Sequence, residues 1–217
     1  MAAVLYSMGK IIHCMRHGPS SMNAYFNLHR YGSPHQEPVR ADPMIFDAQL
    51  TSQGTSIAMA AGVEIQKLST SRPDVVLVSP LRRCMETAQI LLSNSNIDCE
   101  VMAFPLLRER LTLSSDVGSI KSVLMRDFPS VSFPSDASDG EGMDEEWWFR
   151  GEGNSSMSDR IDKEPTEVYE ARLQMLRARL RARKESCILI ISHWGVINSL
   201  TGLDLSPAQI ANVDFKL

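Results

Sequence analysis

Three short apolar runs are the feature of this 217-residue chain that most restricts its possible folds. They occupy residues 10–15, 74–78 and 187–191, and each is largely apolar and rich in β-branched side chains. Half-exposed strands alternate polar and apolar residues, whereas strands covered on both faces are apolar throughout. The runs therefore predict central parallel β-strands, and a weaker run at residues 99–104 predicts a fourth strand.

Helical patterns separate these runs. Apolar residues recur at helical spacing over residues 51–68 and 165–184, and a third helix is expected over residues 80–92 with Ser79 as its N-cap. Strands that alternate with helices are typical of a parallel sheet covered on both faces. We therefore expect an α/β fold with three αβα layers and a mostly parallel central sheet, formed by a single domain over residues 1–217.

Two stretches lack this periodicity. Residues 18–46 are rich in His, Pro and Asn, and residues 130–164 are rich in Ser, Gly, Asp and Glu. The composition of the second stretch favours a solvated loop. The alternative is an inserted lid over the functional site, pinned by Trp147 and Trp148. Because the stretch contains ten Asp and Glu residues, such a lid would repel highly anionic substrates.

The overall charge and composition exclude some classes of protein. Lys and Arg total 22 against 26 Asp and Glu, a net charge of −4, so the surface as a whole is not built for nucleic acid or an anionic membrane. No apolar run approaches the ~18 residues of a membrane-spanning helix. The first ten residues lack the pattern of a signal peptide, and we expect a cytoplasmic protein. The four cysteines are widely spaced and form no CxxC pair, so neither a zinc site nor a disulfide framework is expected.

Charged side chains follow three of the predicted strands. Arg16 and His17 end the first strand, Arg83 follows the second, and His193 follows the last. Ligands of open parallel sheets bind beyond the carboxyl ends of the strands. These ends would bring histidines and arginines to one edge of the sheet, which predicts a local cationic pocket on an acidic protein.

The arginines at the start of the 80–92 helix have different expected partners. Arg82 and Glu86 are four residues apart and can pair on the helix surface. Arg83 faces elsewhere, and a cation in the first turn is disfavoured by the helix dipole. A bound phosphate would offset this cost and could accept hydrogen bonds from the helix N-terminus, so Arg83 is expected to pair with a ligand.

His17 is the candidate nucleophile. Attack on phosphorus requires a neutral imidazole nitrogen, and the adjacent Arg16 disfavours the protonated ring. Gly18 allows the backbone to approach a ligand closely. An acid must also protonate the departing oxygen, and either Glu109 or Asp116, which follow the weak fourth strand, could supply it. Glu109 is the preferred candidate, although the sequence separates the two poorly.

Four segments, in this order, resemble the signature of the histidine phosphatase superfamily, the phosphoglycerate mutase-like proteins. They are Arg16-His17-Gly18, Asp47-x-x-Leu50-Thr51-x-x-Gly54, Ser79-x-x-x-Arg83-x-x-x-Thr87-Ala88 and Ser192-His193-x-Gly195. The first segment alone is weak evidence. Four ordered segments, each in the expected strand or helix context, are specific, and they cover most of the chain from about residue 10 to residue 200.

The resemblance implies a phosphoglycerate mutase-like fold and a phosphohistidine formed on His17, with no metal and no other cofactor. It implies Glu109 as the proton donor. It assigns the phosphate to four ligands, namely Arg16, Asn23, Arg83 and His193. Of these, His193 and the two arginines would also stabilise the charge of the transition state.

Departures from the mutases favour a phosphatase of the small phosphatase branch. The cofactor-dependent mutases have a Trp-Asn element and a Glu-Arg-His-Tyr-Gly run where this chain has residues 19–23 and 109–113. A mutase must retain and re-orient a diphosphorylated intermediate, whereas a hydrolase needs only access for water. We therefore expect a phosphomonoester hydrolase with a small phosphorylated substrate, no nucleic-acid or membrane partner, and a monomeric or homodimeric state. The alternatives are a cofactor-dependent mutase and an inactive module that binds a phosphorylated ligand.

Overall fold

A five-stranded sheet forms the centre of the molecule. The computed structural model describes residues 10–30, 42–67, 72–135, 142–151 and 161–213. The strands are β1 (Ile11–Arg16), β2 (Val75–Val78), β3 (Glu100–Ala103), β4 (Cys187–Ser192) and β5 (Ile210–Val213). Their order in the sheet is β3-β2-β4-β1-β5. The first four are parallel, as predicted, and β5 pairs antiparallel with β1 at the edge.

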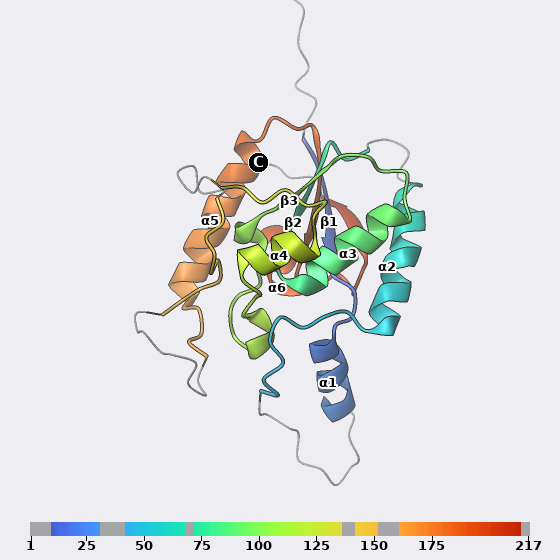
Figure 1. The fold of residues 1–217 in the computed structure, drawn as a ribbon. Helices are drawn as coiled ribbons and strands as arrows, with labels where there is room; N and C mark the ends of the chain where they lie inside the picture. The colour runs from blue at the N-terminus through green and yellow to red at the C-terminus, as the bar shows by residue number, and fades with distance from the viewer. Residues whose placement is uncertain (1–9, 31–41, 68–71, 136–141, 152–160, 214–217) are drawn as a thin grey trace, which may run out of the picture.

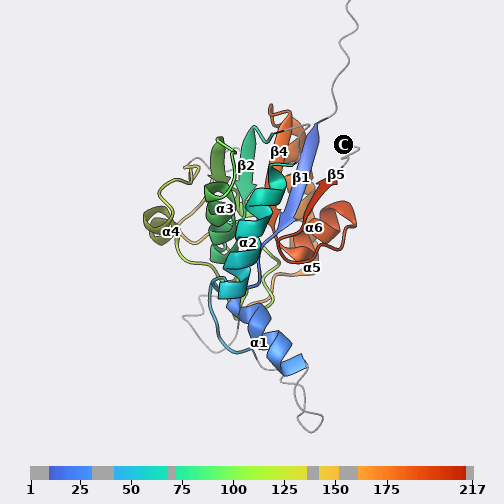
Figure 2. The ribbon, with the colours of Figure 1, turned by 90° about the vertical axis from the view of Figure 1, so that its right-hand side faces the viewer.

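Helices cover both faces of the sheet, as Figure 1 and Figure 2 show. One face carries α2 (Ser52–Ile65), α3 (Arg82–Ser93) and α4 (Lys121–Asp127), and the other carries α5 (Thr166–Ala182) and α6 (Trp194–Thr201). α1 (Ser21–Arg30) extends beyond the end of the sheet at which β1 finishes. The predicted three αβα layers are confirmed, with α1 as an additional helix.

The two faces explain why the strands are apolar without alternation. In β4, Leu189 and Ile191 pack into the apolar cluster that contains α2 and α3. Ile188 and Ile190 pack into the cluster that contains α5 and α6. All four side chains are fully buried. Successive residues of the strand face opposite layers of helices, so apolar side chains are needed on both faces.

The start of α3 differs from its prediction. The helix begins at Arg82 rather than at residue 80, and its N-cap residue, Leu81, makes no capping hydrogen bond through its side chain. Instead the Oδ1 atom of Asp47 accepts a hydrogen bond from the backbone N–H of Arg82 at 2.8 Å. A carboxylate distant in sequence thus satisfies one of the free donors of this helix end.

The predicted pair between Arg82 and Glu86 is wrong. The guanidinium of Arg82 pairs with Asp127 in α4, with 2.7 Å between Nη2 and Oδ2. The carboxylate of Glu86 accepts a hydrogen bond from the backbone N–H of Leu50 at 2.7 Å. Tertiary partners therefore replace a local pair that would contribute only a few tenths of a kcal/mol.

The second signature segment fixes α2 against the loop after β1. Thr51 caps α2, because its Oγ1 atom accepts a hydrogen bond from the N–H of Gly54 at 3.0 Å and donates one to the carbonyl of Pro19 at 3.1 Å. A Cβ atom at position 54 would lie 2.2 Å from that same carbonyl oxygen. Only glycine permits this approach, so the segment sets the position of the chain that follows His17.

Part of the acidic stretch packs against the core rather than over the carboxyl ends of the strands. Trp147 is buried in the apolar cluster that includes Leu124 of α4, and its indole N–H donates to the carbonyl of Ser119 at 2.9 Å. None of the residues 142–151 lines the cavity described below. Two segments of the expected lid, residues 136–141 and 152–160, lie outside the described residues.

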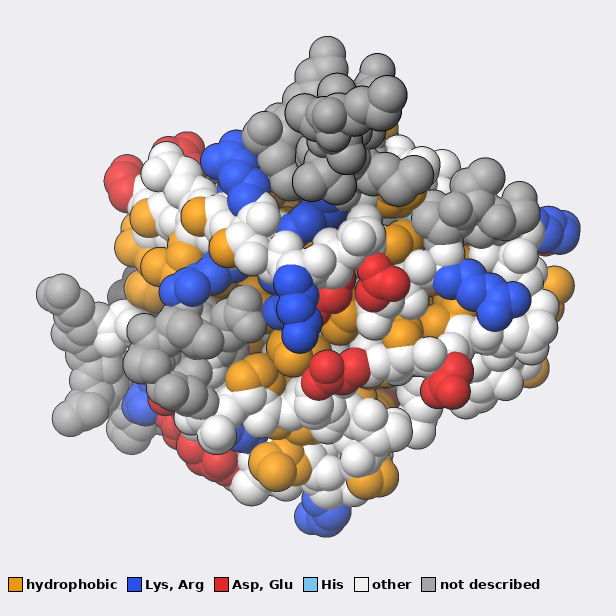
Figure 3. Space-filling model, turned by 90° about the horizontal axis from the view of Figure 1, so that it is seen from above, with side chains coloured by type: hydrophobic (Ala, Val, Ile, Leu, Met, Phe, Trp, Pro, Cys, Tyr) orange, Lys and Arg blue, Asp and Glu red, His pale blue; other side chains and the backbone are white. Residues whose placement is uncertain are grey.

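The end of the sheet at which β1 begins has a mixed surface. Figure 3 views the molecule from that end and shows Lys, Arg, Asp and Glu side chains dispersed among apolar ones, without a continuous patch of one charge. Of the helices that the structure describes, none has the combination of length and apolar character that crossing a membrane requires.

Glu164 forms a buried ionic cluster between α5 and the segment after β3. Its carboxylate accepts hydrogen bonds from Nη2 of Arg108 at 3.1 Å and from Nε and Nη2 of Arg172 at 3.0 and 2.8 Å. Glu164 is fully buried, and burial together with the neighbouring Arg172 lowers the pKa of Arg108 to about 10. The negative charge of Glu164 therefore offsets the free-energy cost of removing the guanidinium groups of Arg108 and Arg172 from water.

Replacing Glu164 with alanine is expected to lower the free energy of unfolding by about 3–5 kcal/mol, because the buried Arg172 and the partly buried Arg108 would lose their counter-charge. Urea unfolding of the Glu164→Ala variant measures this loss. Glu170→Ala, an exposed substitution on the same helix, should change stability by no more than about 0.5 kcal/mol. A similarly small loss in both variants would show that the cluster does not stabilise the fold.

Candidate active site

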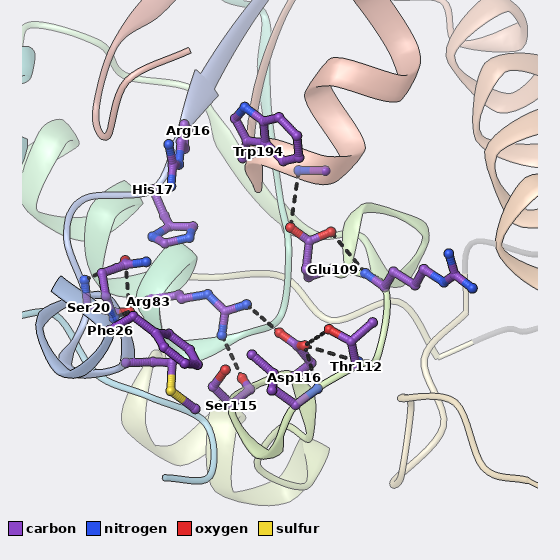
Figure 4. Close-up of a pocket in the computed structure, with 15 residues that line it drawn as sticks. Arg16, His17, Ser20, Phe26, Arg83, Glu109, Thr112, Ser115, Asp116 and Trp194 are labelled. Carbon is purple, nitrogen blue, oxygen red and sulfur yellow. Dashed lines mark hydrogen bonds and ion pairs between the residues drawn. The ribbon is translucent and has the colours of Figure 1, made fainter. Parts of the chain in front are cut away.

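A cavity of about 710 Å³ lies at the carboxyl ends of the parallel strands (Figure 4). Five of the six predicted site residues line it, namely Arg16, His17, Asn23, Arg83 and Glu109. The sixth, His193, is fully buried behind the lining. The structure therefore brings Arg16 to the same cavity as Glu109, which lies 93 positions later in the chain. It also places His193, from the end of β4, behind this cavity.

His17 is held in one tautomer by the backbone. Its Nδ1 atom lies 2.7 Å from the carbonyl oxygen of Gly18, and since a carbonyl only accepts, Nδ1 carries the proton. The Nε2 atom therefore keeps its lone pair. Burial, followed by the charges of Arg83 and Arg16, lowers the pKa of His17 well below its usual value of 6.5. The lowered pKa favours the neutral ring at physiological pH, with the lone pair on Nε2.

His193 occupies the opposite tautomer. The Nε atom of Arg83 donates to its Nδ1 atom at 3.3 Å, and its Nε2 atom lies 2.7 Å from the hydroxyl oxygen of Ser79. A guanidinium only donates, so Nδ1 is the acceptor and the proton resides on Nε2. The ring centroid is 5.2 Å from that of His17. Both nitrogens of His193 thus have protein partners, and the hydrogen bond to its Nδ1 atom helps to fix the position of the Arg83 side chain.

Arg83 has protein partners as well, contrary to the expectation that only a ligand would pair with it. Its Nη1 atom donates to the carbonyl of Ser115 at 2.6 Å, and its Nη2 atom pairs with Oδ1 of Asp116 at 3.0 Å. The other oxygen of Asp116 accepts backbone N–H groups of Thr112 and Leu113 at 3.2 and 3.1 Å. Asp116 therefore positions Arg83, and no local spacing in the sequence indicates this pair.

Of the two carboxyl groups in the described lining of the cavity, Asp116 pairs with Arg83 and Glu109 has no ion pair. Its oxygens accept N–H groups from Arg110 at 3.0 Å and Gly195 at 3.2 Å. Burial, and then the charge of Asp116, raises the pKa of Glu109 above its usual value of 4.5. A Cβ atom at position 195 would lie 2.6 Å from Oε1, so the glycine of the last signature segment makes room for this carboxyl group.

Arg16 and Asn23 offer hydrogen-bond donors that the described residues do not use. Nη1 of Arg16 donates to the carbonyl of Leu205 at 3.1 Å, but its Nε is buried without a partner. The carbonyl oxygen of the Asn23 side chain accepts two hydrogen bonds from Ser20 at 3.0 Å, which leaves its amide N–H groups for another acceptor. A buried N–H without a partner costs about 1–3 kcal/mol, and a bound oxyanion would remove that cost.

The cavity also has an apolar wall that the sequence analysis missed. Its members are Met22 and Phe26 of α1, Leu113, and Trp194 at the start of α6. The spacing of four between Met22 and Phe26 is a helical signal within the stretch expected to be irregular. In the described part of the chain, no group of three or more His, Cys, Asp or Glu side chains is placed to hold a metal ion.

The profile of the histidine phosphatase superfamily (branch 1) matches residues 12–112. A search of curated protein sequences gave no match. Solved structures with the same fold include the ecdysone phosphate phosphatase of Bombyx mori in complex with tungstate, which is 14% identical with a TM-score of 0.61 over 94% of this chain and 88% of that one. They also include a putative α-ribazole-5′-phosphate phosphatase of Escherichia coli, 18% identical with a TM-score of 0.52 over 94% and 89% of the two chains.

A mycobacterial glucosyl-3-phosphoglycerate phosphatase in complex with VO3 is 19% identical, with a TM-score of 0.52 over 94% of this chain and 90% of that one. At these identities the similarity shows the fold. The profile match begins within β1 and ends just beyond Glu109, so it contains three of the four signature segments. The fourth follows β4 at the same cavity. By this profile, residues 12–112 of the chain belong to the histidine phosphatase superfamily.

Proposed function

We propose that the protein is a metal-independent phosphomonoester hydrolase that acts through a phosphohistidine on His17. The observation that carries this proposal is the hydrogen bond from Nδ1 of His17 to the Gly18 carbonyl, 2.7 Å long, in a ring with a lowered pKa. It leaves a neutral Nε2 in a cavity that also contains arginines and a protonatable carboxyl group. The superfamily assignment and the phosphatases of the same fold agree with this chemistry.

The phosphoryl group of the substrate would bind to donors already present in the cavity. Nη2 of Arg16 and the amide of Asn23 donate to no acceptor among the described residues. Nη1 and Nη2 of Arg83 each have a second N–H besides those that contact Ser115 and Asp116. These donors would stabilise the negative charge on the phosphoryl oxygens in the transition state, which is the largest contribution to catalysis in such transfers. His193 would act by holding Arg83.

The reaction would proceed in two steps. In the first, Nε2 of His17 attacks phosphorus, the P–O ester bond breaks, and protonated Glu109 gives its proton to the leaving oxygen. In the second, Glu109 takes a proton from water, the resulting hydroxide attacks phosphorus, and the N–P bond breaks. Inorganic phosphate leaves, and His17 and Glu109 regain their starting protonation states.

Incubating the purified protein with simple alkyl and aryl phosphates tests the proposal. We expect one inorganic phosphate for each alcohol released. Isomerisation of a phosphoglycerate without release of phosphate, dependent on a bisphosphate primer, would instead identify a mutase. Binding of phosphorylated ligands with no chemical change would identify an inactive module.

A further inference from the structure

The cavity is larger than a phosphate requires, and large apolar side chains form part of its wall. The apolar wall consists of Met22, Phe26, Leu113 and Trp194. Figure 4 shows Phe26 and Trp194 on opposite sides of the His17 ring. A volume of about 710 Å³ matches cavities that enclose organic ligands of moderate size. The organic group of a bound ester would therefore lie between these side chains.

Trp194 is fixed in an exposed position. Its indole N–H donates to Oδ1 of Asp204 at 2.7 Å, and the side chain is nevertheless 45% exposed. A large apolar ring held at the mouth of a cavity gains free energy when a ligand covers it. Phe26 turns inward from α1, whereas Leu28 on the same helix is 74% exposed and does not line the cavity. The helix thus presents an aromatic ring specifically to the site.

The charges along the described lining fit a single anionic group. Three arginines contribute, and Arg83 is already paired with Asp116. Arg110 donates from Nε to the carbonyl of Glu164 at 3.0 Å and from Nη2 to Thr166 at 2.9 Å. Arg16 alone keeps a buried nitrogen without a partner. A second phosphate or a carboxylate would have to draw on Arg110, whose Nε and Nη2 groups are held by Glu164 and Thr166, and it would face Glu109 and Asp116.

We infer that the substrate is a phosphate monoester whose organic group is apolar and aromatic and carries no second anionic group. This inference rests on the proposed hydrolase activity. Phosphoryl binding uses Arg16, Asn23 and Arg83, and the apolar wall supplies affinity for the rest of the molecule. Bisphosphates and phosphorylated carboxylic acids are disfavoured because, in the described lining, Arg110 is held by neighbouring acceptors and the carboxyl groups of Glu109 and Asp116 would repel a second anionic group.

Three primary alkyl phosphates with equally basic leaving groups test the inference: 3-phenylpropyl phosphate, propyl phosphate and 4-phosphonooxybutanoate. The value of kcat/KM should be about tenfold or more higher for the phenylpropyl ester than for the propyl ester, the size of effect that apolar contacts in a pocket provide. The carboxylate-bearing ester should be the poorest of the three. Because the leaving groups match, these ratios report on the organic group and not on the chemical step.

Two variants assign the preference to the apolar wall. Phe26→Ala and Trp194→Ala should each reduce the phenylpropyl-to-propyl ratio to about threefold or less. Leu28→Ala, on the same helix as Phe26 but directed to solvent, should keep the ratio of the wild-type enzyme. Trp194 is exposed, so its variant tests the wall even if Phe26→Ala fails to fold.

A wild-type enzyme that hydrolyses the carboxylate-bearing ester as well as the phenylpropyl ester would overturn the inference while leaving the hydrolase proposal intact. An unchanged ratio in both wall variants would overturn it as well. Hydrolysis of none of the three esters would contradict the proposed activity itself, and the inference would fall with it.

Discussion

Replacing His17 with alanine is expected to lower kcat for phosphate monoesters by about 10⁴-fold or more, because a covalent route loses its nucleophile. The neighbouring His193 could not substitute for it. Both nitrogens of His193 are engaged with Ser79 and Arg83, and His193 does not line the cavity. Steady-state release of phosphate by the wild-type and His17→Ala proteins measures the loss.

Two controls separate loss of the nucleophile from loss of structure. His17→Asn keeps an N–H that can donate to the Gly18 carbonyl but has no nucleophilic nitrogen, so it should be as inactive as His17→Ala and unfold at the wild-type temperature. Added imidazole should restore part of the activity of His17→Ala, since it can occupy the vacated space. A His17→Ala protein with more than about a tenth of wild-type activity would exclude covalent catalysis at this residue.

Glu109→Gln is expected to lower kcat/KM for alkyl phosphates by about 10²- to 10⁴-fold, the usual contribution of a general acid. The loss should be much smaller for p-nitrophenyl phosphate, whose leaving group departs without a proton. The difference between the two substrates is the measurement. Equal losses for both would indicate that Glu109 supports the structure of the site rather than proton transfer.

The pH dependence of kcat/KM offers a second test of Glu109. His17 must be neutral to attack, so activity should rise as pH increases through its pKa, which lies below 6.5. Glu109 must be protonated, so activity should fall as pH increases through its pKa, which lies above 4.5. Glu109→Gln should remove the alkaline limb and keep the acidic one.

Asp116→Asn provides the matched comparison for the two candidate acids. Asp116 pairs with Arg83, so its amide variant should weaken substrate binding. The alkaline limb of the profile should remain but shift to lower pH, because the charge of Asp116 helps to raise the pKa of Glu109. If Asp116 were the proton donor, the outcomes of the two variants would be exchanged. The profiles of the wild-type, Glu109→Gln and Asp116→Asn proteins should be measured with one substrate. The ionisation of the phosphate ester then affects all three profiles equally, and the differences between them report on the enzyme.

The parts of the fold that the sequence predicts are those fixed by burial on both faces. β1, β2 and β4 are continuous apolar runs because each contacts helices on two sides, and their carboxyl ends place His17 and His193 at one cavity. β5 is a different case. Its four residues are mostly half-buried at the edge of the sheet, so they lack a distinct apolar pattern.

The partners of the site residues are not predictable from local spacing. Asp116 reaches Arg83 from 33 positions away, and Asp47 reaches the start of α3 from 35 positions away. Such contacts depend on how the loops after β1 and β3 fold over the sheet. The residue types of the site could be predicted, because phosphoryl transfer needs them, but their pairing required the structure.

The bond between phosphorus and Nε2 of His17 can be observed directly. The enzyme is mixed with a labelled phosphate monoester, quenched in alkali during the first turnover and digested, and the labelled peptide is identified by mass spectrometry. We expect the label on the peptide that contains His17, its loss on further incubation with water, and no label in the His17→Ala protein. A label on another residue, or a burst of alcohol release with no label on the protein, would contradict the phosphohistidine mechanism.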